Sequence, residues 1–158
     1  MTGCLVTDKA ELEQEENFPP SIESQTGMDV EHPLDEVIIF NQDEEAFDGE
    51  LELDVIVRDP NVDQELILQT FVDGAGRIGF DSLPGDGEVE RRRNVFVEEG
   101  LFSQEGCRRI DLLVSSDFQL GNLRKPTEPG DIGTARWWVF TRPAAAEEIN
   151  PSICPGQP

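Results

Sequence analysis

Apolar and polar residues alternate along several short stretches of this chain, and alternation with period two predicts half-buried β-strands. The clearest stretch is 50–58, in which two leucines and two valines share one face while mostly charged residues fill the other. The stretches 109–115 and 134–141 alternate in the same way. We therefore expect three amphipathic strands there, each with one face in a core.

Four shorter apolar runs complete a count of about seven strands, the number typical of an immunoglobulin-like (Ig-like) sandwich. These runs are Val37 to Phe40, Glu65 to Val72, Arg77 to Phe80 and Asn94 to Glu98. Clusters of Gly, Pro, Asp and Asn separate the runs and favour turns, because proline fixes φ and glycine accepts positive φ. The sequence predicts an all-β fold, with an Ig-like β-sandwich as the first choice and an up-and-down barrel as the alternative.

The N-terminal part differs in composition from the rest. Residues 1–50 carry 15 acidic and one basic side chain, whereas residues 51–158 carry 19 and 11. The stretch 7–33 has few large apolar residues, so burial cannot offset the entropy lost on ordering. We interpret 1–33 as a disordered acidic tether, 34–143 as the sandwich and 144–158 as a C-terminal tail. A short helix over residues 9–16 is the competing interpretation.

The overall charge narrows the range of partners. The chain has 34 acidic and 12 basic side chains, for a formal net charge of -22. Such a surface repels nucleic-acid phosphates and anionic lipid headgroups. We expect cations or basic protein surfaces as partners.

Residues for common catalytic chemistry are scarce. The single histidine, His32, lies in the expected tether, so a Ser-His-Asp or Cys-His arrangement around a core histidine cannot form. Acid pairs such as Glu88 with Glu90, or Asp111 with Asp117, leave a carbohydrate-active enzyme as an alternative. We expect a non-enzymatic protein without a cofactor, or with calcium alone.

Two further patterns favour structural interpretations. Residues 74–79 match the G-x-G-x-x-G dinucleotide pattern, but a strand and not a helix follows the glycines, so we expect a hairpin. Residues 91–93 are three arginines among glutamates, and we expect local ion pairing there.

Three segments, "ELDVIVRDPNVDQELILQTFVDG", "GCRRIDLLVSSDF" and "GTARWWVFT", occur in that order. Together they resemble bacterial Ig-like, cadherin-like or fibronectin type III-like modules over residues 36–142. The resemblance implies a module that binds a partner or serves as a structural spacer, and that does not catalyse a reaction.

The cysteine at position 4 suggests an anchor. Met1-Thr2-Gly3-Cys4, followed by the acidic stretch, resembles the end of a bacterial lipobox. The resemblance implies a lipid on Cys4 and a location in the periplasm or on the cell surface, with the outer membrane as the expected site of attachment. An ordinary free thiol is the alternative.

Cys107 and Cys154 are left as a pair. In an extracytoplasmic protein an even pair suggests a disulfide. Cys107 has the parity of the outward set of its strand, opposite to Ile110, Leu112 and Val114. A bond to Cys154 would therefore fasten the tail across the outer face of a sheet. Two buried free thiols are the alternative.

Oxygen donors alternate in the loop after the clearest strand. Asp59, Asn61 and Asp63 resemble the start of a calcium loop, and cadherin-like modules bind calcium through such clusters. Asp117, Glu128 and Asp131 could join from another loop. Asp and Asn are also good turn residues, which is the alternative.

Together these observations favour a non-enzymatic extracytoplasmic lipoprotein that presents an Ig-like binding or structural module at the bacterial cell envelope. Its partner would be an unknown protein or envelope component, and it would be a monomer or part of a larger assembly. A calcium-dependent adhesion module and a carbohydrate-active enzyme are the alternatives.

Overall fold

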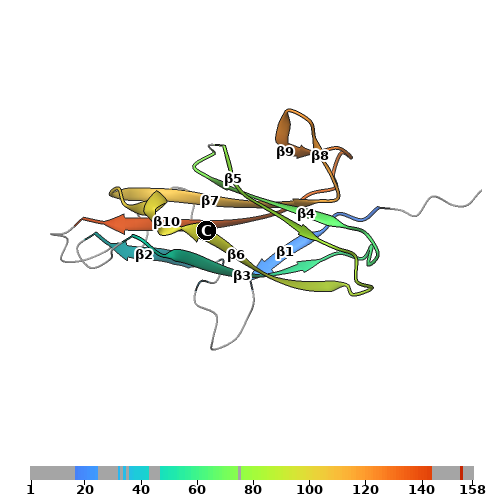
Figure 1. Ribbon diagram of the computed structural model, residues 1–158, viewed down its shortest axis with the longest axis horizontal. Coiled ribbons are helices and arrows are strands. Elements are labelled where there is room, and N and C mark those ends of the chain that lie inside the picture. Colours follow the sequence, from blue (N-terminus) through green and yellow to red (C-terminus); the bar gives the residue numbers. More distant parts are fainter. Residues whose placement is uncertain are drawn as a thin grey trace, which may run out of the picture.

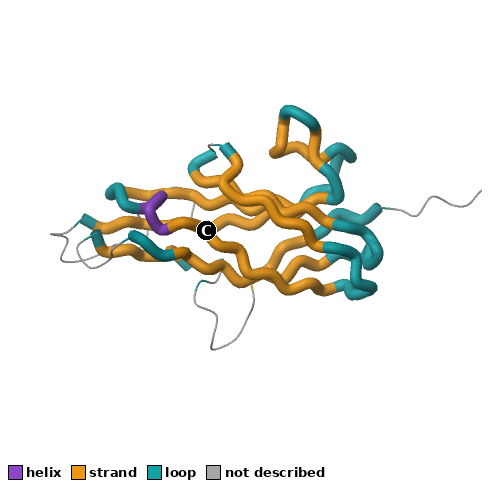
Figure 2. Tube along the Cα trace, in the orientation of Figure 1, coloured by secondary structure: helices purple, strands orange, loops and turns teal. Residues whose placement is uncertain are grey.

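The computed structural model describes residues 17–24, 32, 34, 36–42, 47–74, 76–143 and 154. Strands make up most of the described chain, as Figure 2 shows. The strands are β1 Ser21–Ser24, β2 Val37–Asn41, β3 Glu50–Arg58, β4 Leu66–Val72, β5 Arg77–Leu83, β6 Glu90–Glu98, β7 Gly106–Ser115, β8 Phe118–Gln119, β9 Asn122–Pro126 and β10 Gly133–Arg142. One short 3₁₀ turn, η1 Glu99–Phe102, follows β6.

Apart from β8 and β9, which pair with each other, the strands form two stacked sheets (Figure 1). One sheet has the order β1-β3-β6, and the other has the order β2-β10-β7-β4-β5. The strand pairs within these sheets are antiparallel except β2 and β10, which run parallel. This division of sequential strands between two sheets is that of an Ig-like sandwich. The chain is an all-β, Ig-like β-sandwich.

The predicted alternation builds the core. In β3, Leu53, Val55 and Val57 are fully buried, while mostly charged residues alternate with them. The inward residues of β7 and β10 join the same cluster, and Trp137 is its largest fully buried side chain. All seven expected strands are present, and most extend a few residues further than their apolar runs.

The expectation that residues 1–33 form a disordered tether is wrong for residues 21–24. Ser21–Ser24 is a strand that pairs with Val55–Arg58 of β3. Ile22 joins the main core, and Glu23 forms an ion pair with Arg58 at 3.6 Å. Edge pairing needs main-chain groups and one apolar side chain, so high acidity alone did not exclude it. The sandwich therefore begins before residue 34, and the remaining tether residues lie mostly outside the described ones.

A hairpin formed by β8 and β9 was not expected. In Figure 1 it stands on the outer side of the five-stranded sheet. Phe118 of the hairpin packs with Phe71 and Leu113 in a second, smaller cluster. Because of this cover, β7 is buried on both faces from Ile110 to Ser115.

Candidate functional site

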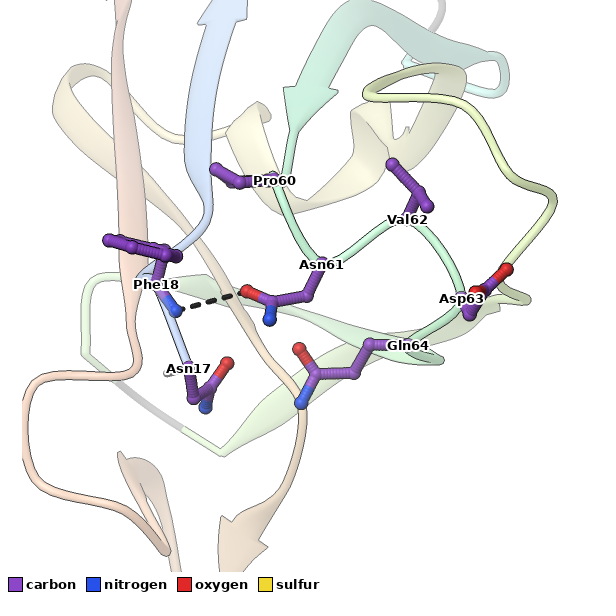
Figure 3. A pocket seen from close by; sticks show the side chains of 7 residues that line it. All are labelled: Asn17, Phe18, Pro60, Asn61, Val62, Asp63 and Gln64. Atoms are coloured by element: carbon purple, nitrogen blue, oxygen red, sulfur yellow. Dashed lines mark hydrogen bonds between the residues drawn. The ribbon is translucent and has the colours of Figure 1, made fainter. Parts of the chain in front are cut away.

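The loop that follows β3 borders a hollow at one end of the sandwich. This hollow has a volume of about 640 Å³ and is lined by Asn17, Phe18 and residues 60–64. Figure 3 shows that these side chains come from two segments far apart in sequence. The main-chain N–H of Phe18 donates to Asn61 Oδ1 at 3.0 Å, which joins the two segments.

A buried arginine holds the loop from inside. Arg91 of β6 is 4% exposed. Its guanidinium donates to the carbonyl oxygens of Gln64 at 2.8 Å, of Asn61 and Val62 at 3.2 Å each, and of Leu83 at 3.4 Å. Such a set matches the fixed fork of an arginine and would not suit a lysine.

Two carboxylates balance the charge of Arg91. The carboxylate oxygens of Asp59 and Asp86 each lie 3.7 Å from one of its nitrogens. Asp59 is fully buried, whereas the Asp86 side chain is about half exposed. The ion pairing expected for residues 91–93 is confirmed for Arg91 and for Arg93, which pairs with Asp81. The partners of these two arginines are aspartates of neighbouring turns and strands, not the adjacent glutamates.

The expected calcium ligands Asp59, Asn61 and Asp63 are not brought together. Asn61 accepts from Phe18, and Asp63 is exposed and directed away from Asn61 in Figure 3. The loop carbonyls that would complete a calcium shell already accept from Arg91. Among the described residues, no group of three or more His, Cys, Asp or Glu side chains is placed to hold a metal ion.

The same end contains buried oxygens without a hydrogen-bond donor. Asp131 is 4% exposed, and its Oδ2 accepts from Ser115 and Ser116, but its Oδ1 has no donor. Asp59 Oδ2 also lacks a donor, as do Asn17 Oδ1 and Gln64 Oε1. Burial raises the pKa of Asp59, and the nearby charge of Asp131 raises it further, although a main-chain hydrogen bond from Asn61 and the charge of Arg91 oppose the shift.

A second ionic cluster fastens the β8–β9 hairpin to the sheet. The Asp111 side chain is 6% exposed and lies 3.1 Å from Arg109, 3.3 Å from Arg124 and 2.9 Å from Arg136. The guanidinium of Arg124, on β9, also lies 4.1 Å from the centre of the Phe71 ring. Sequence patterns did not predict this cluster, because its members come from three strands that only the fold brings together.

The acid pairs considered for glycoside cleavage have other partners. Asp111 is saturated by three arginines, and Asp117 accepts from Thr127 at the base of the hairpin. Glu90 forms an ion pair with Arg58 at 2.9 Å. These contacts favour structural roles for the carboxylates.

The expected disulfide is present. Cys107 and Cys154 are bonded, with their Cα atoms 5.6 Å apart. Cys107 lies opposite Phe140 in the register and not among the inward residues of β7, as its parity predicted. Cys154 is 4% exposed. Cys4 lies outside the described residues, so its lipidation stays a prediction.

Two other expectations concern residues 74–79 and His32. β4 and β5 follow each other in the chain and pair antiparallel, so the glycine-rich stretch belongs to a hairpin, as expected. The carbonyl oxygen of His32 accepts from the indole N–H of Trp137 at 3.0 Å. This contact ties one more residue of the expected tether to the sandwich.

Strand order and register thus define a single Ig-like module with a closed ionic loop at one end. No protein-family model matches the chain, and no curated protein matches it. Among solved structures, it is similar to the CARDB domain of the PF1109 protein from Pyrococcus furiosus, determined in complex with di-metal ions. That similarity covers 82% of this chain and 100% of the other, at 13% identity and a TM-score of 0.46. Within the described residues, no helix is both long and apolar enough to cross a bilayer.

Proposed function

We propose that this chain is a non-enzymatic bacterial lipoprotein that presents its Ig-like sandwich as a binding or structural module at the cell envelope. The Cys107–Cys154 disulfide carries this proposal. Structural disulfides persist in oxidising compartments and are rare in the reducing cytosol. A lipid on Cys4 would anchor the module, and the acidic residues around it would keep the module away from anionic headgroups.

The state of the buried carboxylates supports binding over catalysis. Asp59 and Asp111 are 0% and 6% exposed and both face arginines, so neither is placed to contact a leaving group. An Ig-like scaffold places its loops and sheet faces where a partner can reach them.

The test uses protein isolated from its own cells. Mass spectrometry of N-terminal peptides should detect a diacylglyceryl group on Cys4, and Cys4→Ser should move the protein from the membrane fraction to the soluble fraction. In the same samples, Cys107 and Cys154 should react with an alkylating reagent only after reduction. Alkylation of both without reductant would contradict the extracytoplasmic location, and an unmodified Cys4 would contradict the anchor.

We propose cation binding as a second candidate, favoured by the buried oxygens that lack donors. Asp131 Oδ1 could hold a calcium ion, with Asn17 Oδ1 and Gln64 Oε1 at the same end. Titration calorimetry of the full chain with calcium chloride should give saturable heat that Asp131→Asn removes and Asp63→Ala leaves. Heat that Asp63→Ala removes would favour the loop set predicted from sequence, and no heat would exclude calcium.

A further inference from the structure

A groove runs between the edge strands of the two sheets. Two adjoining hollows of about 190 and 350 Å³ lie between β5 and β6 and share Phe96. The inner hollow reaches core residues such as Leu68 and Val95, and Gly79 of β5 leaves it open. Asp81, which lines the inner hollow, pairs with Arg93, so an ion pair joins β5 and β6 at this end of the groove.

Exposed apolar side chains gather along this groove. Ile78 and Phe80 on β5 are 41% and 57% exposed, and Phe96 and Leu101 on the other side are 52% and 39% exposed. Single exposed apolar residues are ordinary, but a group of four around one groove marks an interaction surface.

The groove also offers an unpaired strand edge. Within the part of the chain that the structure describes, β6 pairs only with β3, and β5 pairs only with β4. An edge strand presents a row of main-chain donors and acceptors that can template a further strand. Recognition by strand addition uses these main-chain bonds for affinity and side-chain pockets for specificity.

The charge around Phe96 indicates which segment would fit. Phe96 lies opposite Glu52 across the sheet, and Glu98 follows it on the same face. Glu50 and Glu98 also line the outer hollow. One basic group stands on the other wall, where the Arg77 guanidinium lies 5.0 Å from the centre of the Phe80 ring. The rim is therefore net acidic.

We propose that the groove between β5 and β6 binds an extended polypeptide segment in which apolar residues alternate with lysine or arginine. The apolar side chains enter the two hollows, and the basic ones face Glu50, Glu52 and Glu98. A second copy of this chain fits poorly, because β6 pairing with its own copy would set these glutamates against each other. The inference rests on the binding role proposed above, and it is independent of the lipid anchor.

The experiment uses the full disulfide-bonded chain and three synthetic peptides of about eight residues, a typical strand length. One alternates valine with lysine, one alternates serine with lysine, and one alternates valine with glutamate. Fluorescence anisotropy should give saturable binding for the first peptide and at least about tenfold weaker binding for the other two. Hydrogen exchange should show new protection at β6 amides.

Variants locate the binding. Phe96→Ser combined with Ile78→Ser should weaken the binding of the valine-lysine peptide at least about tenfold. Leu120→Ser, at an exposed apolar residue on the hairpin, should leave that affinity unchanged. Equal binding of the serine-lysine peptide would reveal non-specific charge attraction and overturn the proposal. Concentration-dependent dimerisation that Phe96→Ser abolishes would also overturn it, in favour of a second copy. A negative result for peptide binding would not affect the tests of Cys4 lipidation and of the disulfide, which concern the proposed lipoprotein role.

Discussion

The guanidinium of Arg91 and the carboxylate of Asp59 lie 3.7 Å apart, and both side chains are withdrawn from water. The pair joins the end of β3 to the start of β6. Three of the four carbonyls around Arg91 belong to the loop that carries Asn61 and Val62, and the fourth is that of Leu83 on β5. The loop predicted to bind calcium thus already surrounds a positive charge, the guanidinium of Arg91, which lies about thirty positions later in the chain.

Arg91→Lys should destabilise the fold by about 3–5 kcal/mol, because lysine cannot reach four carbonyls and leaves Asp59 poorly paired in the interior. Urea unfolding followed by tryptophan fluorescence measures the loss. The matched control is Arg92→Lys, at the exposed neighbouring position, which should change stability by less than about 0.5 kcal/mol. Equal effects of the two substitutions would contradict the role given to Arg91.

The raised pKa of Asp59 predicts a pH dependence. The folded chain keeps a proton on this carboxyl at pH values where the unfolded chain has lost it. The ionised Asp59 therefore costs folding free energy above its raised pKa, and acidification through that pKa removes the cost. The free energy of unfolding of the wild type minus that of Asp59→Asn should rise as the pH falls through this range. A difference that falls on acidification would show that the pKa is lowered instead.

Asp111→Asn should release the β8–β9 hairpin, because three arginines lose the charge that holds them together. We expect a loss of about 1–3 kcal/mol in stability and faster tryptic cleavage after Arg124. Asp54→Asn, on a strand of the other sheet, is the control. Unchanged cleavage after Arg124 would mean that the apolar contacts of Phe118 hold the hairpin without the ionic cluster.

Removal of the disulfide should lower stability without unfolding the core. Cys107 and Cys154 are 47 residues apart, and closing a loop of that size contributes about 4 kcal/mol in the chain-entropy model. Cys107→Ser with Cys154→Ser should therefore lower the melting temperature by at least several degrees, whereas Cys4→Ser should leave it unchanged. An unchanged melting temperature in the double variant would contradict a stabilising role for the bond.

The strands could be predicted because their signal is local. Alternation over 50–58 reflects one buried and one exposed face, and no distant residue alters it. β1 and the β8–β9 hairpin were not predicted, because their strands are short and carry few apolar residues. One signal could have revealed the hairpin, namely the adjacent residues Gly121 and Asn122 in its turn. Gly121 adopts a positive φ of 83° there.

The candidate site was harder to predict, because its members are distant in sequence. Asp59 was predicted as a calcium ligand, whereas the structure pairs it with Arg91, which enters the loop from another strand. The disulfide was accessible to sequence reasoning, since parity within one strand fixed the face on which Cys107 lies. Ionic clusters such as that of Asp111 require knowledge of strand order, which periodicity does not provide.

The Cys107–Cys154 bond also decides how the module would respond to mechanical force. A pull at the C-terminal end enters the sandwich through Cys107 on β7, a strand paired on both sides, and so bypasses β10. A pull from the N-terminal side first meets β1, which pairs with β3 of the other sheet, so a load between the two ends passes from one sheet to the other. The sandwich is therefore expected to resist extension between its two ends, and reduction of one covalent bond would make it yield at a lower load.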